Sequence, residues 1–177
     1  MKFNYKKKVF AKNFDKELEI LTNSLRKFKL PPGFFDFIFY VISELFVNIK
    51  EHAQIKEGLI VLKIKENQCL IKVEDHGIGI RRSYLKKNIF PKDDFSAIEF
   101  ALSGLSTKSF QERGFGLYSI RKLVETLKGK LLIKTGFAKV LIRKNKISFQ
   151  RLKKEFKGTS VEIEVPIKKL DFYKIIT

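Results

Sequence analysis

The segment from Phe34 to His52 constrains the fold more than any other part of the sequence. It has the spacing of a helix, and its apolar residues occupy nearly every side. Such a helix is stable in water only when other parts of the chain cover it on most sides. A Pro-Pro-Gly sequence at 31–33 separates it from an earlier helix. We therefore expect 34–52 to form the centre of a helical layer.

The few polar residues of this segment share one helical face. Glu44 and Asn48 are four residues apart, and Glu51 and His52 follow one turn later. A solvated face normally carries flexible lysines, whereas a buried amide left unpaired costs about 1–3 kcal/mol. Two interpretations remain open at this point: a narrow hydrated stripe with a helix-to-loop hydrogen bond, or part of a binding site.

The rest of the chain contains further helix and strand patterns and no internal repeat or linker. Residues 81–113 are predicted to be irregular apart from a short helix near 95–102. Helices come first and strands later, with one helix inserted, so the sequence predicts an α+β fold and a single domain over 1–177. The remaining predicted elements are an edge strand at 2–10, a helix after a capping Asn13, strands at 59–65, 69–74, 131–135, 138–143 and 159–165, and a helix from Leu117 that Gly129 ends.

Composition indicates a globular protein. Of the 177 residues, 44% are hydrophobic, and no apolar run has the length of a membrane-spanning helix. The single cysteine, Cys69, excludes an internal disulfide and lies in an apolar strand, which predicts a small buried hydrophobic residue. A reducing cytoplasmic location, with no membrane partner, is the expectation that follows.

The charge is unusual. The chain has 37 Lys and Arg residues against 19 Asp and Glu residues, which gives a formal net charge of +18. A basic surface can bind nucleic acid or another acidic partner. The basic residues are scattered and do not form one block, so solvated faces are the favoured interpretation and an acidic or nucleic-acid partner is the alternative.

Two glycine-containing sequences have the pattern of ligand-binding loops. In "VEDHGIGI", a strand ends at Asp75, and Gly77 and Gly79 follow, which lets the backbone approach a flat ligand closely. In "RGFGL", Gly114 and Gly116 precede a helix whose free N–H groups suit phosphates. Each pattern alone is also typical of an ordinary turn or loop.

Two common nucleotide-binding motifs are excluded. Ser119 occupies the third glycine position of a dinucleotide-binding fingerprint, and no β-α-β unit surrounds it. A P-loop sequence is absent as well.

Four segments together resemble a known superfamily. "ELFVNIKEHA", "EDHGIGI", "RGFGL" and "GTSVEI" are similar, in this order, to the N, G1, G2 and final Gly-Thr boxes of the GHKL superfamily of ATP-binding domains. The resemblance covers about 34–167. It implies the Bergerat fold, which is a two-layer α/β sandwich with a mixed, mostly antiparallel sheet, helices on one face and a mobile ATP lid, here about 81–113.

The resemblance also implies ATP and Mg²⁺ as ligands and assigns the adenine end of the site. Asp75 would accept a hydrogen bond from the adenine amino group. Gly77 and Gly79 would shape the base pocket. Thr159, which follows Gly158, would support the adenine contact through its hydroxyl group.

At the phosphate end, the resemblance implies that Asn48 coordinates the magnesium ion. Glu44 occupies the position that activates a water or a hydroxyl group in several branches. The phosphates would be held by Gly114, Gly116 and Leu117, and Lys108 in "GLSTKS" is a further candidate phosphate contact.

The sequence departs from the superfamily pattern at two places. Ile49 follows Asn48 where alanine is usual, and it is expected to crowd the helix. His76 occupies a position more often held by Asn, Asp or Thr, and it is expected to face the pocket. Residues 1–30 match no pattern of the superfamily.

The positions of the boxes also indicate which branch of the superfamily the chain is most similar to. Both histidines lie inside ATP-site boxes, so a self-contained histidine kinase is not expected, and only a short tail follows Pro166, where clamp ATPases have a transducer domain. The layout is most similar to small standalone members such as anti-sigma-factor serine kinases, which phosphorylate Ser or Thr of a partner protein; a homodimer is compatible with it. The alternatives are a nucleotide-dependent binding module with little turnover and the ATPase subunit of a larger clamp.

Overall fold

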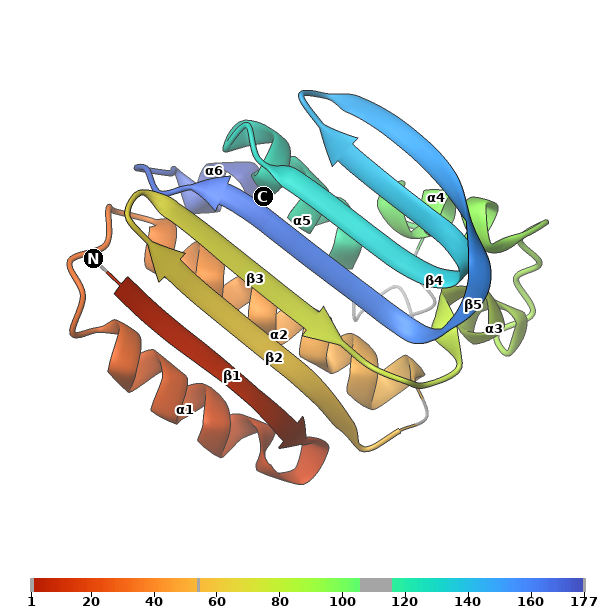
Figure 1. Ribbon diagram of the computed structural model, residues 1–177, viewed down its shortest axis with the longest axis horizontal. Helices are drawn as coiled ribbons and strands as arrows, with labels where there is room; N and C mark the ends of the chain where they lie inside the picture. Colours follow the sequence, from red (N-terminus) through yellow and green to blue (C-terminus); the bar gives the residue numbers. More distant parts are fainter. Residues whose placement is uncertain (1, 54, 106–115, 177) are drawn as a thin grey trace.

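The computed structural model describes residues 2–53, 55–105 and 116–176. Within these ranges the chain forms a five-stranded sheet in the order β1-β2-β3-β5-β4, with helices behind one face (Figure 1). The predicted α+β sandwich is confirmed. The elements are β1 (Lys2–Phe10), η1 (Ala11–Asn13), α1 (Phe14–Leu25), α2 (Phe34–His52), β2 (Glu57–Lys65), β3 (Gln68–Glu74), α3 (Gly79–Leu85), α4 (Asp94–Leu102), α5 (Gly116–Thr126), β4 (Lys130–Arg143), β5 (Lys146–Pro166) and α6 (Phe172–Ile176).

Every neighbouring pair of described strands is antiparallel. The resemblance implied a mixed, mostly antiparallel sheet, whereas the strands in the described part of the chain are all antiparallel. Ile71 of β3 lies opposite Leu62 of β2 and Ile163 of β5, and all three side chains are fully buried on the helix side. Because side chains alternate between the faces of a strand, this register turns their charged neighbours to the opposite face.

Helix α2 lies at the centre of the helical layer, as its composition predicts. Eight of its side chains are buried between the sheet and the neighbouring helices. Phe46 stacks on Phe14 of α1 with a distance of 4.1 Å between ring centroids. Figure 1 shows α2 behind β2 and β3, with α1 and α5 on its two sides. This position brings the Glu44–Asn48 face of α2 toward the ends of the strands.

Four local expectations were wrong or incomplete. Residues 79–85, mostly expected to be irregular, form α3, and residues 146–157 extend β5 well beyond the predicted strand. Asn13 does precede α1, but its side chain makes no capping hydrogen bond, because η1 leads directly into the helix. A short C-terminal helix, α6, had no counterpart in the sequence interpretation.

Strands β4 and β5 continue beyond the sheet as a two-stranded ribbon. The pairing between them shifts register at Gly136, and the ribbon bends there (Figure 1). Beyond the bend, β5 pairs with β4 alone, because β3 reaches only from Ser160 to Pro166 of β5. Ala138, Val140 and Ile142 of β4 remain buried, whereas most of residues 146–157 are exposed.

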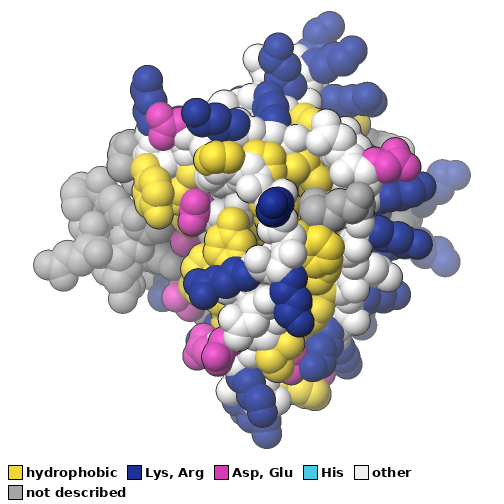
Figure 2. Space-filling view, turned by 90° about the vertical axis from the view of Figure 1, so that its left-hand side faces the viewer, with side chains coloured by type: hydrophobic (Ala, Val, Ile, Leu, Met, Phe, Trp, Pro, Cys, Tyr) yellow, Lys and Arg dark blue, Asp and Glu magenta, His cyan; other side chains and the backbone are white. Residues whose placement is uncertain are grey.

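Three composition-based expectations can be compared with the structure. Cys69 is 1% exposed, and burial raises the pKa of its thiol to about 12, so it is the buried hydrophobic residue that the sequence predicted. None of the helices in the described ranges is long and apolar enough to cross a membrane. On the end of the molecule seen in Figure 2, Lys and Arg side chains are spread among hydrophobic ones, as the scattered sequence positions suggest.

Candidate functional site

A cavity of about 130 Å³ lies where α2, α3 and the start of α5 meet the end of β3 and the middle of β5. It is lined mainly by apolar side chains, including Ile49, Val73 and Val161. The structure brings six of the sequence-predicted residues together around it. They are Asn48, Asp75, Gly79, Gly116, Leu117 and Thr159.

Asp75 directly follows β3 and is held in place by backbone contacts. Its N–H donates to the carbonyl oxygen of Thr159 at 2.9 Å, and the N–H of Gly77 donates to its Oδ1 at 2.7 Å. The N–H of Ile78 donates to the carbonyl oxygen of Ala53 at 3.0 Å, which fixes the following loop against the end of α2. A carboxylate is thereby fixed at the cavity wall, in a position set by the β3–β5 pairing.

Burial decides the electrostatics of Asp75. The residue is only 6% exposed, and removal from water raises the pKa of its carboxyl group. The backbone hydrogen bonds from Gly77 and Thr159 oppose this effect without cancelling it. A buried carboxylate of this kind favours a ligand that donates a hydrogen bond to it, because such a donor replaces lost water.

Three glycines around Asp75 occupy positions where a side chain has no room. A Cβ on Gly77 would lie 2.0 Å from the carbonyl oxygen of Ala53. One on Gly158, whose φ is +80°, would lie 2.2 Å from the carbonyl oxygen of Asp75. One on Gly79, whose φ is +77°, would lie 2.7 Å from the hydroxyl oxygen of Thr135. This wall is thus formed by close backbone packing, which explains its glycine content.

Two residues at the site were missed by the sequence analysis. The Thr135 hydroxyl donates to the carbonyl oxygen of Gly158 at 2.9 Å and accepts the N–H of Ile80 at 3.1 Å, so it joins α3 to the β4–β5 pair. Tyr84 of α3 lines the cavity and donates through its hydroxyl group to the carbonyl oxygen of Leu105. Burial raises the pKa of Tyr84 to about 12. Neither residue lies in a glycine motif, so only the fold reveals them.

The opposite end of the cavity is formed by α2 and by the start of α5. Asn48 is half-buried, and Gly116 begins α5 with Leu117 as its second residue. The first N–H groups of a helix have no intrahelical partners, and the helix dipole adds positive potential there. A built Cβ on Gly116 would meet no described atom within 4 Å, in contrast to the Cβ atoms built on Gly77, Gly79 and Gly158.

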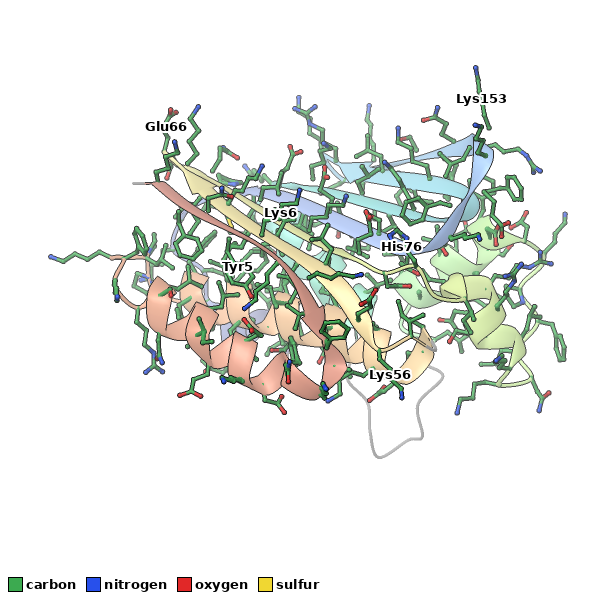
Figure 3. All side chains as sticks on the ribbon, turned by 60° about the horizontal axis from the view of Figure 1, so that its bottom comes forward. Tyr5, Lys6, Lys56, Glu66, His76 and Lys153 are labelled. Carbon is green, nitrogen blue, oxygen red and sulfur yellow. The ribbon has the colours of Figure 1, made fainter. Side chains whose placement is uncertain are left out.

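The other predicted residues lie in different places. Gly77 lines the reverse side of its loop, and Lys108 and Gly114 lie outside the described residues. His76 was expected to face the pocket, but it is exposed and its ring lies near Phe156, with 6.4 Å between ring centroids (Figure 3). His76 lies beyond β3, in the turn that the Gly77-to-Asp75 hydrogen bond closes, and its side chain is not among those that line the cavity.

Glu44 lies one helical turn before Asn48 and is half-buried, but it is not among the residues that line the cavity. Its charge contributes to the raised pKa of Tyr40, after the larger effect of burial. Tyr40 also shares a side-chain hydrogen bond with the buried Ser119 of α5. Glu44 therefore lies close to the interface between α2 and α5, beside the cavity.

The residues present fit a magnesium ion that is held mostly by a nucleotide. Among the described residues, no group of three His, Cys, Asp or Glu side chains is placed to hold a metal. Mg²⁺ commonly takes few protein ligands and completes its shell with phosphate oxygens and water. The Asn48 amide oxygen at the cavity wall would be such a protein ligand.

Comparison with known proteins agrees with this geometry. A family model described as "Histidine kinase-, DNA gyrase B-, and HSP90-like ATPase" matches residues 35–169. No curated protein matches the chain in sequence. The matched span includes α2, the Asp75 loop, the start of α5 and the Gly158–Thr159 pair, which are the parts that form the cavity. The chain is therefore an ATP-binding domain of the GHKL type and belongs to the family of histidine kinase-, DNA gyrase B- and HSP90-like ATPases.

Proposed function

We propose that this chain binds Mg-ATP in the described cavity and acts as a kinase-like regulator that phosphorylates Ser or Thr of a partner protein. The observation that carries the proposal is that Asp75, Asn48 and the start of α5 line one cavity. In this proposal residues 1–177 form a single domain of a cytoplasmic protein.

The adenine base would lie at the closely packed end of the cavity. Asp75 accepts a hydrogen bond from the adenine amino group, and Thr159 supports the same contact from the neighbouring strand. Gly77 and Gly79 keep the loop against α2 and β4, which holds the carboxylate in place. Val73, Ile49 and Val161 provide apolar surface for the ring.

The phosphates would lie at the other end. Asn48 holds the magnesium ion, and the N–H groups at Gly116 and Leu117 bind phosphate oxygens at the start of α5. Lys108 and Gly114 complete this group in the proposal. Residues 81–113 serve as the lid, and α3 and α4 form its described part, tied together by the contact of Tyr84 with Leu105.

Glu44 would act as the base. The bound nucleotide supplies the phosphoryl group, and the metal neutralises its charge. Glu44 accepts the proton of the partner's Ser or Thr hydroxyl group as that oxygen bonds to the γ-phosphorus and ADP leaves. Its place on α2, on the same face as Asn48 and one turn away, supports this role.

A binding module with little turnover is the second candidate function. One observation favours it: Glu44 does not line the cavity, whereas the residues needed for nucleotide binding do. Such a module, or the ATPase subunit of a clamp, would use Asn48 and Asp75 to bind ATP and would use the bound state to control a partner.

The two functions differ in their dependence on Glu44. In the kinase, Glu44→Gln lowers phosphotransfer or hydrolysis by roughly 10²–10⁴-fold, because a general base contributes about that factor. Its ATP affinity changes little, because the base acts on the transition state. Asn48→Ala loses both magnesium-dependent binding and turnover. ATP affinity, turnover and melting temperature are measured for each variant.

Glu51→Gln is the matched control, since it removes a carboxylate from the same helix at a more exposed position. It should leave turnover unchanged. Normal turnover in Glu44→Gln would contradict the kinase, and ATP binding by a wild-type protein without turnover would favour the module. A failure of the wild type to bind ATP would overturn both.

A further inference from the structure

A second and larger cavity, of about 630 Å³, lies on the reverse side of the glycine loop. It is formed by α3, by the start of α4 and by the bend of the β4–β5 ribbon. The two cavities share Gly79, while Gly77, Thr135 and Gly158 face the second one. The proposed nucleotide site lies on the other side of the loop and shares only part of its backbone with this groove, whose side chains differ in chemistry.

Basic and aromatic side chains line the groove together. Arg81, Arg82 and Lys157 provide the cations, and Phe137 and Phe156 provide the rings. Phe137 is 37% exposed, and the Arg151 guanidinium lies 5.2 Å from its ring centroid. Recessed rings next to cations can stack on flat bases while the cations contact phosphates.

The two carboxylates of the groove offset two of its three cations, so its lining keeps a net positive charge. Asp94 accepts the N–H of Phe137 at 2.8 Å, so its carboxylate serves the ribbon bend. Glu155 lies 3.6 Å from Arg82, and both side chains are largely exposed, so this pair is weak. Arg81 donates to the carbonyl oxygen of Lys92 at 2.9 Å, while its buried Nε has no hydrogen-bond partner among the described residues.

The ribbon continues the basic surface away from the groove. Of the 21 residues from 137 to 157, eight are Lys or Arg and one is Glu, whereas the whole chain has 37 and 19 among 177. Lys153 and Lys154 are exposed, and Figure 3 shows Lys153 projecting from the ribbon into solvent. Charge is thus concentrated here well beyond the composition of the chain.

We propose that the groove and the ribbon bind single-stranded nucleic acid. The cations follow its phosphates, and Phe137 and Phe156 stack on its bases. A stretch of acidic protein would use the cations but has no need of the rings. A lipid surface would contact only the projecting rings, such as that of Phe149, which is 48% exposed, and would not reach the half-buried Phe156 in the groove wall. This proposal does not rest on kinase activity.

The test uses the full chain and a short labelled single-stranded oligonucleotide, with binding followed by fluorescence polarisation over a range of salt. The triple variant Lys153→Glu, Lys154→Glu and Lys157→Glu should bind much more weakly. The slope of log K against log salt should fall by about two, since each phosphate contact on a single strand contributes about 0.7. ATP affinity should not change.

The matched control carries the same charge change at the opposite edge of the sheet, where α1 lies (Figure 1). Lys12→Glu, Lys16→Glu and Lys27→Glu replace three exposed lysines there. This variant should keep the salt slope of the wild type. An equal loss of affinity in both triple variants would overturn the proposal, because net charge alone would then explain binding.

Phe137→Ala tests the stacking contact separately from charge. It should weaken binding roughly 5- to 150-fold while the salt slope stays the same. Three results would each overturn the proposal. They are unchanged affinity in a folded Phe137→Ala protein, equal binding of single- and double-stranded oligonucleotides, and binding to anionic vesicles without binding to oligonucleotides.

Discussion

The two ends of the nucleotide cavity are built in opposite ways. At the Asp75 end, a Cβ on Gly77 or Gly158 would come within 2.2 Å of a backbone oxygen, and hydrogen bonds join β3, β4, β5 and α2. At the Gly116 end, no described atom lies within 4 Å of the corresponding Cβ. The first end is defined by packing, and the second by the kinds of polar group that face it.

This difference indicates how each end recognises a ligand. A closely packed wall with one fixed carboxylate can select a flat base by shape and by its hydrogen-bond donor. A helix N-terminus with an amide nearby attracts charge and tolerates variation in position. Substitutions should therefore act through structure at the first end and through charge and metal at the second.

The largest difference is expected when one methyl group is added at each end of the nucleotide cavity by a Gly→Ala substitution. Gly77→Ala forces the loop away from Ala53, which should lower the free energy of unfolding by about 1–3 kcal/mol and abolish ATP binding. Gly116→Ala meets no described atom within 4 Å, and among the described residues only its own φ of +43° opposes it, so ATP binding should persist. Chemical denaturation and ATP titration check both variants. Similar losses in the two would remove the distinction between the ends.

A smaller effect concerns Asp75 in the absence of nucleotide. Because burial raises its pKa in the folded chain, the favourable contribution of Asp75 is present below the ordinary carboxyl pKa and is lost as pH rises through the raised value. At neutral pH its ionised form therefore lowers stability. Asp75→Asn should raise the melting temperature of the nucleotide-free protein at neutral pH, and the difference should shrink as pH falls.

Asp93 provides a control of opposite sign. Hydrogen bonds from Ser96 lower its pKa, so its contribution is present above the ordinary carboxyl pKa and is lost as pH falls. Asp93→Ala should lower the melting temperature at neutral pH, because it removes the N-cap of α4. If Asp75→Asn also lowers the melting temperature, then Asp75 stabilises the nucleotide-free protein. The destabilising effect assigned to its buried, ionised form would then be wrong.

The smallest effect is expected for Tyr84→Phe. The variant removes the hydroxyl donor to Leu105 and keeps the ring, so the free energy of unfolding should fall by about 1 kcal/mol. Adenine recognition should remain, because Asp75 and its glycines are unchanged. Denaturation together with ATP titration measures both. A large loss of ATP affinity would show that the contact of Tyr84 belongs to the binding site itself.

Much of the fold follows from periodicity where one face of an element is buried. The helix at 34–52 and the strand at 69–74 were predicted within one residue because their apolar spacing is clear. The extension of β5 over 146–157 was missed because both of its faces are largely exposed, so no alternation marks it. Helix α3 was missed because it is short and begins at a glycine.

In the candidate site too, sequence motifs predict some residues and only the fold reveals others. Asp75, Gly79, Asn48 and Gly116 follow from motifs, and the structure places them around one cavity. Thr135 lies 55 residues from the Ile80 N–H that it accepts, so no local pattern reveals it. The motif predicts that His76 lies near the site, but it does not determine which way the side chain points. The exposure of His76 was therefore not predicted.

The central claim is that Asp75 recognises the base and Asn48 recognises the metal-bound phosphates within one cavity. Calorimetric titration of adenosine and of Mg-ATP into Asp75→Asn and Asn48→Ala tests it most directly. Asp75→Asn should weaken both ligands by the same factor, roughly 5- to 150-fold, which corresponds to about 1–3 kcal/mol for a mispaired polar group. Asn48→Ala should weaken Mg-ATP and leave adenosine unchanged. Loss of adenosine binding in Asn48→Ala, or unchanged adenosine binding in Asp75→Asn, would contradict the account.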